Sequence, residues 1–246
     1  MTSLLPIIGL VFAAAITPGP NNLIVLQAGA RRSLGAIGSA IGVIGSGNVG
    51  TALAKLLVPA GNQVMLTYSR DSGKLSAAAK TFGATTGTPA EAAAFGDVVA
   101  LTVPWVAVED ALKAAGALNE KILWDCTNAL KPDLSGLAIG TTISGGETIA
   151  KLAPGARVVK GIPPFAELMH STDPTIGGTP VGVFMCGDDA AAKAIVRLLL
   201  EALPTTVVDA GPLQNARYAE PAAFILIPLA YSLGMGSRIG LQLIHA

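Results

Sequence analysis

Three glycines have the spacing of a loop that binds the pyrophosphate of a dinucleotide: Gly45, Gly47 and Gly50 form the pattern G-x-G-x-x-G. An apolar run at residues 40–44 precedes them, and a helical pattern of leucines follows. In such a unit the first glycine permits a tight turn, the second admits the pyrophosphate, and the third lets the helix approach the strand. The start of the helix then offers free N–H groups to phosphate. We interpret the loop as dinucleotide-binding; a glycine turn that serves only packing is the alternative.

The end of the next expected strand, residues 63–68, indicates which dinucleotide is bound. Sites for NAD usually place an acid there, which binds the ribose hydroxyls. Here Ser69 and Arg70 take that position, and Lys74 follows one helical turn later. Two cations and a hydroxyl suit a 2′-phosphate, so the pattern favours NADP over NAD. In the alternative, Arg70 and Lys74 are ordinary exposed charges and Asp71 takes the role of the acid.

The elements that must position these residues alternate between strand and helix. Strands are expected at residues 98–103, 122–125, 158–161, 181–186 and 206–209, with capping boxes at Thr88 and Ser144 and a long helix over residues 189–202. This order predicts an α/β fold with a doubly wound, mostly parallel sheet of the Rossmann type. Ligands of such sheets lie beyond the carboxyl ends of the strands. That rule places Thr102, Val103, Pro104, Trp105, Asn128 and residues 161–165 around one crevice.

Few residues near this crevice could transfer protons. The chain has two histidines, His170 and His245, and shows no Ser–His–Asp or paired-carboxylate arrangement. Lys160 and His170 are the nearby candidates for a general acid or base. We expect Lys160 to cap a strand end or face solvent, and His170 to lie in a surface loop. No catalytic residue is therefore assigned from the sequence.

Four further residues near the crevice or after it have structural interpretations. Cys126 is expected to be a small buried residue at a strand end. Trp105 either stacks near the nicotinamide or is a core aromatic. Arg217 and Glu220 lie three residues apart on an expected helix, which predicts an ion pair between them.

Composition limits the class of protein. Of 246 residues, 51% are hydrophobic and 13% are charged, and the formal net charge is zero. This composition excludes a disordered chain, and the absence of a basic excess argues against nucleic-acid binding. The two cysteines, Cys126 and Cys186, lack the spacing of a zinc site or a disulfide framework. They suit a reducing compartment, and we expect a cytoplasmic protein that holds no metal.

The first 39 residues form a hydrophobic leader of a different character. Residues 1–40 contain no acid and two charges, Arg31 and Arg32, and their apolar run at residues 4–16 is shorter than a membrane span. The stretch ITPGPNNLIVLQAGARRSLGAIGSA, residues 16–40, resembles the start of the LysE family of amino-acid exporters. Three interpretations stay open: a gene-fusion relic, a membrane tether, or a helix that packs on the main domain. We favour an inert relic or packing element over membrane contact.

The last part of the chain is expected to be helical and to form a dimer. Residues 211–246 follow the expected nucleotide-binding domain, residues 40–210, and residues 221–237 carry no charge. Pro228, Gly234 and Gly236 interrupt this stretch. Burial in the domain or in a homodimer interface is favoured over a membrane span, because a monomer would expose a large apolar patch.

Five segments together resemble one family. They are IGVIGSGNVGTALAKLL, YSR before Lys74, ALTVPW, FMCGDD and VVDAGPLQNARYAEP, and the last is the most specific. Residues 40–246 resemble the NADPH-dependent reductases of coenzyme F-420, a deazaflavin. Ferric reductase domains of some membrane proteins share several of these motifs. The resemblance implies an NADP-dependent oxidoreductase with a deazaflavin or flavin as second substrate.

The resemblance also implies roles for individual residues. Ser46, Gly47, Asn48 and Val49 would contact the pyrophosphate, Ser69, Arg70 and Lys74 the 2′-phosphate, and Thr102, Val103 and Pro104 the nicotinamide ribose. The substrate segment, with Ile162, Pro163 and Phe165, has prolines at Pro163 and Pro164 where the family has polar residues. This departure leaves the hydride acceptor open. A reductase of small imines or carbonyls and a non-catalytic NADP-binding module are the alternatives.

Overall fold

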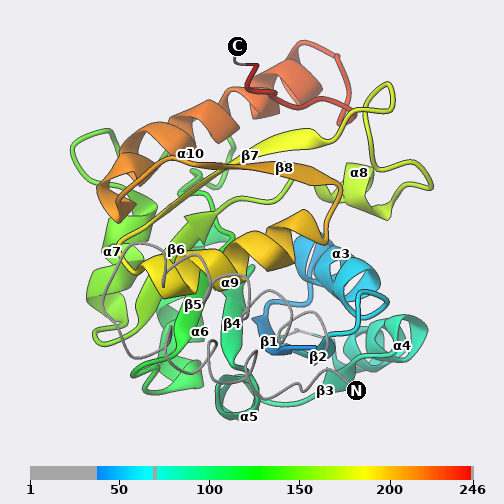
Figure 1. Cartoon of the computed structure of the whole chain (residues 1–246), viewed down its shortest axis with the longest axis vertical. Coiled ribbons are helices and arrows are strands. Elements are labelled where there is room, and N and C mark those ends of the chain that lie inside the picture. The colour runs from blue at the N-terminus through cyan, green and yellow to red at the C-terminus, as the bar shows by residue number, and fades with distance from the viewer. Residues whose placement is uncertain (1–37, 69–70, 245–246) are drawn as a thin grey trace, which may run out of the picture. The chain divides into compact units, whose positions relative to one another are not determined.

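The computed structural model describes residues 38–68 and 71–244. Its strands are β1 (Ala40–Ile44), β2 (Gln63–Thr67), β3 (Thr85–Thr86), β4 (Val98–Leu101), β5 (Ile122–Asp125), β6 (Arg157–Gly161), β7 (Val181–Gly187) and β8 (Thr205–Asp209). They form one sheet in the order β3-β2-β1-β4-β5-β6-β7-β8 (Figure 1). All neighbours are parallel except β6 and β7, which are antiparallel. The predicted doubly wound, mostly parallel α/β fold is confirmed.

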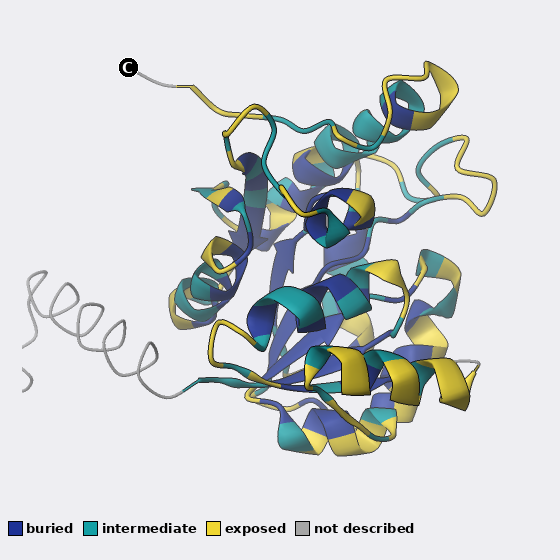
Figure 2. Ribbon diagram, turned by 90° about the vertical axis from the view of Figure 1, so that its right-hand side faces the viewer, coloured by how far each residue is buried: buried dark blue, intermediate teal, exposed yellow. Residues whose placement is uncertain are grey.

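Helices cover both faces of the sheet. On one face lie α3 (Asn48–Leu57), α4 (Ser72–Phe82), α8 (Ala166–His170) and α9 (Ala190–Glu201), and on the other α5 (Pro89–Phe95), α6 (Val108–Ala115) and α7 (Gly145–Leu152). Figure 2 shows buried strands between helices whose outer sides are exposed. Leu53 and Leu57 of α3 are fully buried against the sheet. Each such side chain stabilises the fold by about 1.5–3 kcal/mol.

The helix starts follow from local sequence. Both predicted capping boxes are present: Thr88 and Glu91 cap α5 reciprocally, and Ser144 and Glu147 cap α7. The carboxylate of Asp189 accepts a hydrogen bond from Ala192 N at 2.7 Å and caps α9. Because each cap satisfies backbone N–H groups that a helix start leaves without partners, it contributes about 1 kcal/mol.

Strand β4 is shorter than predicted and ends at Leu101 rather than at residue 103. The next residue turns toward the glycine loop, residues 45–50. Thr102 N donates to Ile44 O at 2.9 Å, and its hydroxyl donates to Gly45 O at 2.7 Å. Pro104 has no N–H for a further ladder bond. The turn after β4 therefore leaves the sheet beside the glycine loop.

The predicted C-terminal helical extension is present, but it ends at residue 232 and the chain beyond it is irregular. After the short η2 (Leu213–Asn215), helix α10 (Ala216–Phe224) and a π-helical turn, η3 (Pro228–Ser232), lie beside β7. Gly234 and Gly236 then adopt φ angles of 73° and 78°, which end the helical path. The chain returns along β7, where Gly182 N donates to Leu241 O at 2.7 Å. We call residues 238–241 the strap.

In the part of the chain that the structure describes, no helix has both the length and the apolar character of a membrane span. The expectations for residues 1–37, including the likeness to exporters, lie outside the described residues.

Candidate functional site

The glycine loop is built by a close approach of α3 to β1. Gly45 has a φ angle of 123°, which favours glycine. A Cβ atom on Gly50 would lie 1.8 Å from Gly45 O, so any other residue there would push the helix away from the strand. At Gly47, by contrast, a Cβ atom would meet nothing within 4 Å. The loop is closed on the side of the protein and open at Gly47.

The start of α3 suits an anionic group. Gly47 is the N-cap and supplies no side-chain cap, and the first turn carries no acid. Free N–H groups and the positive end of the helix dipole therefore meet the open side of the loop. Gly47, Asn48 and Val49 line a cavity there, whereas Gly45 and Gly50 are buried behind them and Ser46 is half-buried. The residues present fit a pyrophosphate.

The cavity, of about 520 Å³, lies at the carboxyl edge of the sheet. It brings together most of the residues that the sequence predicted for the site: Gly47, Asn48, Val49, Thr102, Val103, Pro104, Trp105, Asn128, Ile162, Pro163 and Phe165. η1 (Trp105–Ala107), a single 3-10 turn, places Trp105 at this wall, where the residue also packs against the core. The chain ends of β4, β5 and β6 therefore meet around one space, as the parallel sheet requires.

The predicted residues for the 2′-phosphate are placed only in part. Ser69 and Arg70 lie outside the described residues. Lys74 is exposed in the first turn of α4, and its backbone N–H donates to Asp71 Oδ1 at 3.0 Å. Asp71 is thus the N-cap of α4. The carboxylate of Asp71 serves this helix, which gives it a structural role.

One half of the cavity is apolar. We call this wall the apolar half. It is formed by Val181, Val183, Leu226, Ile227, Ile239 and Leu241. The strap supplies the last two, and Arg238 fixes it by donating to Asp173 O at 3.0 Å and Thr175 O at 2.9 Å. Phe165 and Tyr231 complete the wall with their rings edge to face, 5.7 Å apart.

Tyr231 is a polar residue at this wall that the sequence did not single out. Its hydroxyl donates to Glu167 Oε1 at 3.3 Å. Partial burial, together with the neighbouring Glu167 carboxylate, raises the pKa of Tyr231, so the phenol keeps its proton at neutral pH. Tyr231 stands in an uncharged stretch without a motif, and it reaches the cavity from η3, which the sequence did not predict to lie there.

Lys160 is buried, which corrects its expected place at a strand end or in solvent. Its side chain is 0% exposed, and Nζ donates to Asp125 Oδ2 at 2.8 Å and to Thr127 O at 2.7 Å. Glu220 Oε1 lies 3.0 Å from the same nitrogen. Burial opposes the charged form, but the two carboxylates outweigh it and raise the pKa of Lys160. We call Lys160, Asp125 and Glu220 the Lys160 cluster.

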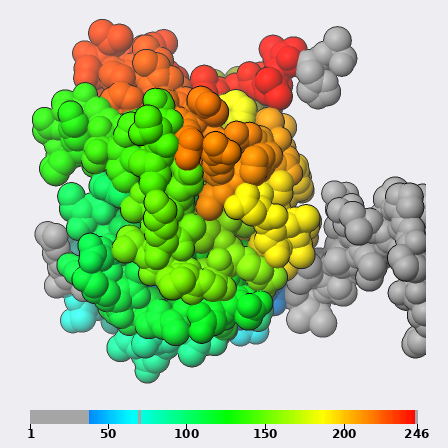
Figure 3. All heavy atoms as spheres, turned by 90° about the vertical axis from the view of Figure 1, so that its left-hand side faces the viewer, coloured from blue at the N-terminus to red at the C-terminus, as the bar shows by residue number. Residues whose placement is uncertain are grey.

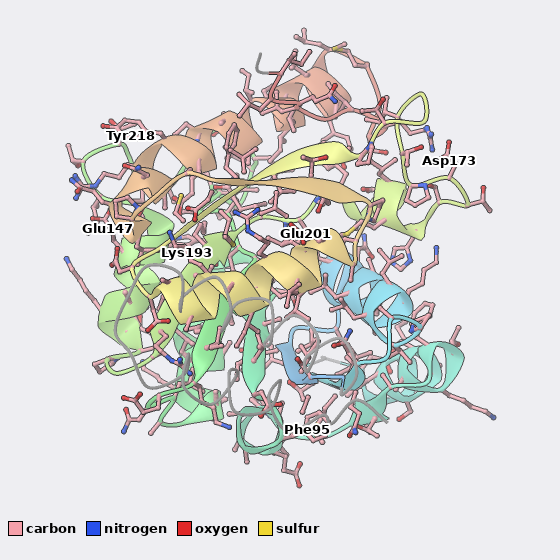
Figure 4. The ribbon with its side chains drawn as sticks, in the orientation of Figure 1. Phe95, Glu147, Asp173, Lys193, Glu201 and Tyr218 are labelled. Atoms are coloured by element: carbon pink, nitrogen blue, oxygen red, sulfur yellow. The ribbon has the colours of Figure 1, made fainter. Side chains whose placement is uncertain are left out.

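The predicted ion pair between Arg217 and Glu220 is wrong. Arg217 instead donates two hydrogen bonds to Glu147, at 2.8 and 2.6 Å. Figure 4 labels Glu147 on α7 and Tyr218 on α10, on the side of the molecule where these helices meet. Glu220 turns inward and accepts hydrogen bonds from Gly145 N at 2.8 Å and Gly146 N at 2.9 Å. Both side chains therefore bind partners that are distant in the sequence, instead of each other.

His170 does not lie in a loop as expected, because it ends helix α8. Its Nε2 lies 3.1 Å from Asn48 O and 3.3 Å from Thr51 Oγ1. Lys55 Nζ donates to His170 O at 2.7 Å and to the carbonyls on either side of it. These contacts fasten α8 to α3, which gives His170 a structural role beside the glycine loop.

Cys126 is buried, as expected, and lines the cavity. Burial raises the pKa of its thiol well above the ordinary value, which disfavours the thiolate. Among residues 38–68 and 71–244, no group of three or more His, Cys, Asp or Glu side chains could hold a metal ion.

Comparisons with known proteins show which family this chain resembles. The family model for coenzyme F420-dependent NADP oxidoreductases matches residues 40–129. A crystal structure from Arthrobacter sp. FB24, described as a candidate F420-dependent NADP-reductase, is 32% identical and has a TM-score of 0.75; the match covers 85% of this chain and 100% of that one.

More distant relatives share parts of the chain or the fold. The metalloreductase STEAP3 of Rattus norvegicus is 28% identical over 192 residues, 76% of this chain, which spans 37% of the metalloreductase. A reductive aminase from Aspergillus terreus, solved with NADPH, is 22% identical with a TM-score of 0.60, and the match covers 80% of this chain and 62% of the aminase. At that identity the likeness shows the fold.

Proposed function

Because the chain belongs to the coenzyme F420-dependent NADP oxidoreductase family, we propose that it transfers a hydride between NADP(H) and a planar redox ring, a deazaflavin or a flavin. One observation carries this proposal: a single cavity joins the open side of the glycine loop to the apolar half. The first part suits a dinucleotide phosphate, and the second suits an apolar ring beside the nicotinamide.

In this proposal, each part of NADP(H) has its own set of residues. Ser46, Gly47, Asn48 and Val49 hold the pyrophosphate; Ser69, Arg70 and Lys74 hold the 2′-phosphate; and Thr102, Val103, Pro104, Trp105 and Asn128 surround the nicotinamide riboside. The cap formed by Asp71 on α4 supports NADP over NAD, because the nearest acid is engaged with its own helix. When bound, the nicotinamide supplies or accepts the hydride.

The remaining residues of the cavity position the hydride acceptor and exclude water from it. Ile162, Pro163 and Phe165 lie beside the apolar half, where they exclude water from the acceptor. Transfer between two rings depends on their juxtaposition more than on an acid or base. The buried thiol of Cys126 and the engaged ammonium of Lys160 are consistent with a site that orients its ligands.

A screen of acceptors tests the proposal. The full chain is mixed with NADPH and with coenzyme F420, FMN or a cyclic imine, and NADPH absorbance is followed. Consumption with F420 or FMN supports the proposal. Consumption with the imine alone replaces it by the second candidate, and binding without any turnover contradicts both.

The second candidate, reduction of a small imine or carbonyl, is favoured by Tyr231. Such a substrate needs a proton as well as a hydride, and the protonated phenol of Tyr231 at the cavity wall could supply it. Tyr231→Phe separates the two candidates. It should lower imine turnover by about 10²-fold or more if Tyr231 is the acid, and should change F420 or FMN turnover little.

A further inference from the structure

The ammonium of Lys160 joins β6 to two segments that are far from it in the sequence, the end of β5 with its following turn, and α10. It bonds to Asp125 at the end of β5, to the carbonyl of Thr127 in the following turn, and to Glu220 on α10. All three protons of the ammonium thus have an acceptor. The side-chain amide of Asn128 closes the arrangement by donating to Glu220 O at 3.2 Å.

Each of these segments is also a wall of the cavity. Thr127 and Asn128 line it after β5, and Ala219 and Ala223 of α10 line it on either side of Glu220. Ile162, two residues after Lys160, lines it after β6. None of these walls belongs to the glycine loop. Lys160 therefore sets the spacing of one end of the cavity.

Stability alone does not account for a buried charge cluster. Well-packed hydrophobic residues often stabilise a core as much as a buried ion pair does, whereas loss of one partner leaves an uncompensated charge. Here the excess carboxylate is balanced by the start of α7, whose Gly145 and Gly146 N–H groups donate to Glu220. Directional contacts of this kind fix distances between segments, which apolar packing does less strictly.

We propose that Lys160 is a positioning residue for the nicotinamide half of NADP(H), acting through Thr127, Asn128 and α10. It has no part in holding the adenosine and phosphate half. This inference rests on the proposed binding of NADP(H) in the cavity. According to this inference, a fully buried side chain determines the width of the space that receives the nicotinamide.

The test compares two ligands, NADP⁺ and adenosine 2′,5′-bisphosphate, which lacks the nicotinamide. Their affinities are measured by calorimetry, and the fluorescence of bound NADPH reports the surroundings of its ring. Lys160→Met should weaken NADP⁺ about ten-fold, equivalent to about 1.4 kcal/mol, alter NADPH fluorescence, and leave the bisphosphate unchanged. Equal losses for both ligands, or no loss, would overturn the inference.

Two further variants make the result decisive. Lys160→Met combined with Glu220→Gln keeps the cluster at one negative charge, as in the wild type, and answers the question if the single variant does not fold. Arg217→Met is the matched control, because it breaks a different ion pair of α10, the one with Glu147 of α7, which lies outside the cavity. It should leave the ratio of the two affinities unchanged, and a change equal to that of Lys160→Met would overturn the inference.

Failure of the inference differs from failure of the proposed function. A wild-type chain that binds neither NADP⁺ nor the bisphosphate overturns both. Wild-type binding without turnover contradicts the hydride transfer, while the two affinities still decide the role of Lys160.

Discussion

Arg70 is the residue on which the predicted preference for NADP over NAD depends most directly. A hydrogen bond between charged groups contributes about 1.5–3 kcal/mol, so Arg70→Ala should weaken NADP about 10- to 100-fold. NAD, which lacks the 2′-phosphate, should be affected little. Lys80→Ala is the matched control, because it removes the same charge from the far end of α4. Equal losses for NADP and NAD would contradict the assignment.

Glu147 makes stability depend on pH. Its hydrogen bonds from Arg217 lower the pKa of Glu147 from 4.5 to about 2. A lowered pKa contributes stability that is full above pH 4.5 and is lost as the pH falls toward 2. Arg217→Met should therefore lower the free energy of unfolding at neutral pH, and the gap to the wild type should close across that range.

Urea unfolding at a series of pH values measures this gap. Lys113→Met serves as the comparison, because the Lys113–Glu109 pair has side chains that are 68% and 62% exposed. Exposed ion pairs contribute little to stability, so Lys113→Met should change the free energy of unfolding less than Arg217→Met does at neutral pH. A gap for Arg217→Met that stays constant down to pH 2 would remove Glu147 as its cause.

At this scale the sequence predicted the residues with a local pattern and missed those without one. The cavity collects Thr102, Asn128 and Phe165 because each follows a strand end, which an apolar run reveals. Lys160 also lies near a strand end, but its partner Glu220 comes sixty residues later. Nothing near Lys160 in the sequence shows that an acid covers it, so solvent was the natural expectation.

At the scale of elements, the glycine loop and α3 allow stability and binding to be separated. Gly50→Ala places a methyl group 1.8 Å from Gly45 O and should lower the free energy of unfolding by about 1–3 kcal/mol. Gly47→Ala meets no protein atom within 4 Å and should change it by less than about 0.5 kcal/mol. Its methyl group points to the open side, so NADP should still bind more weakly.

Thermal unfolding and NADP titration check these two variants together. If Gly47→Ala lowered the free energy of unfolding as much as Gly50→Ala, the expectation that a methyl group at residue 47 meets no protein atom would be wrong. If it left NADP affinity unchanged, the pyrophosphate would lie elsewhere.

Capping boxes and apolar runs predicted most helices and strands, because both signals are local. The antiparallel pairing of β6 with β7 and the return of the strap depend on contacts between distant residues. The helical prediction for residues 211–246 holds for α10 and η3 but not for the chain after residue 232, for the same reason. Leu241 pairs with Gly182 on the part of β7 that β6 leaves without a partner, and this contact competes with helix formation.

At the scale of the whole molecule, the C-terminal surface predicts a homodimer. Tyr218, Ile225, Leu233 and Met235 are 68%, 49%, 71% and 63% exposed. Figure 3 shows that the C-terminal residues, in orange and red, gather at one end of the face in view. Apolar side chains exposed together usually mark an interface. Light scattering should give twice the mass of the chain at micromolar concentration.

Substitutions on this surface make the dimer prediction specific. Leu233→Asp together with Met235→Asp should shift the mass to that of a monomer. The exposed Val106, 68% exposed on η1, provides a control, and Val106→Asp should leave the dimer intact. A wild-type chain that is a monomer at micromolar concentration would refute the prediction.

The leader, residues 1–39, is predicted to be dispensable for NADP binding. Strand β1 starts at Ala40 and the glycine loop follows it directly, so the elements that form the described phosphate site all come after the leader. A chain beginning at Ser39 should keep the NADP affinity of the full chain, whatever happens to its solubility. A shortened chain that folds but does not bind NADP would place part of the leader in the active domain.

The two edges of the sheet are unequal, and this governs how copies of the molecule can meet. Strand β3 has two residues, whereas β8 has five and could accept a foreign strand. Arg197 from α9 blocks β8 by donating to Val207 O at 3.0 Å, and Lys193 holds Asp209 at its end. An incoming strand would have to displace both cations. We therefore expect the β8 edge to resist addition of a strand, so that copies of the chain associate through other surfaces.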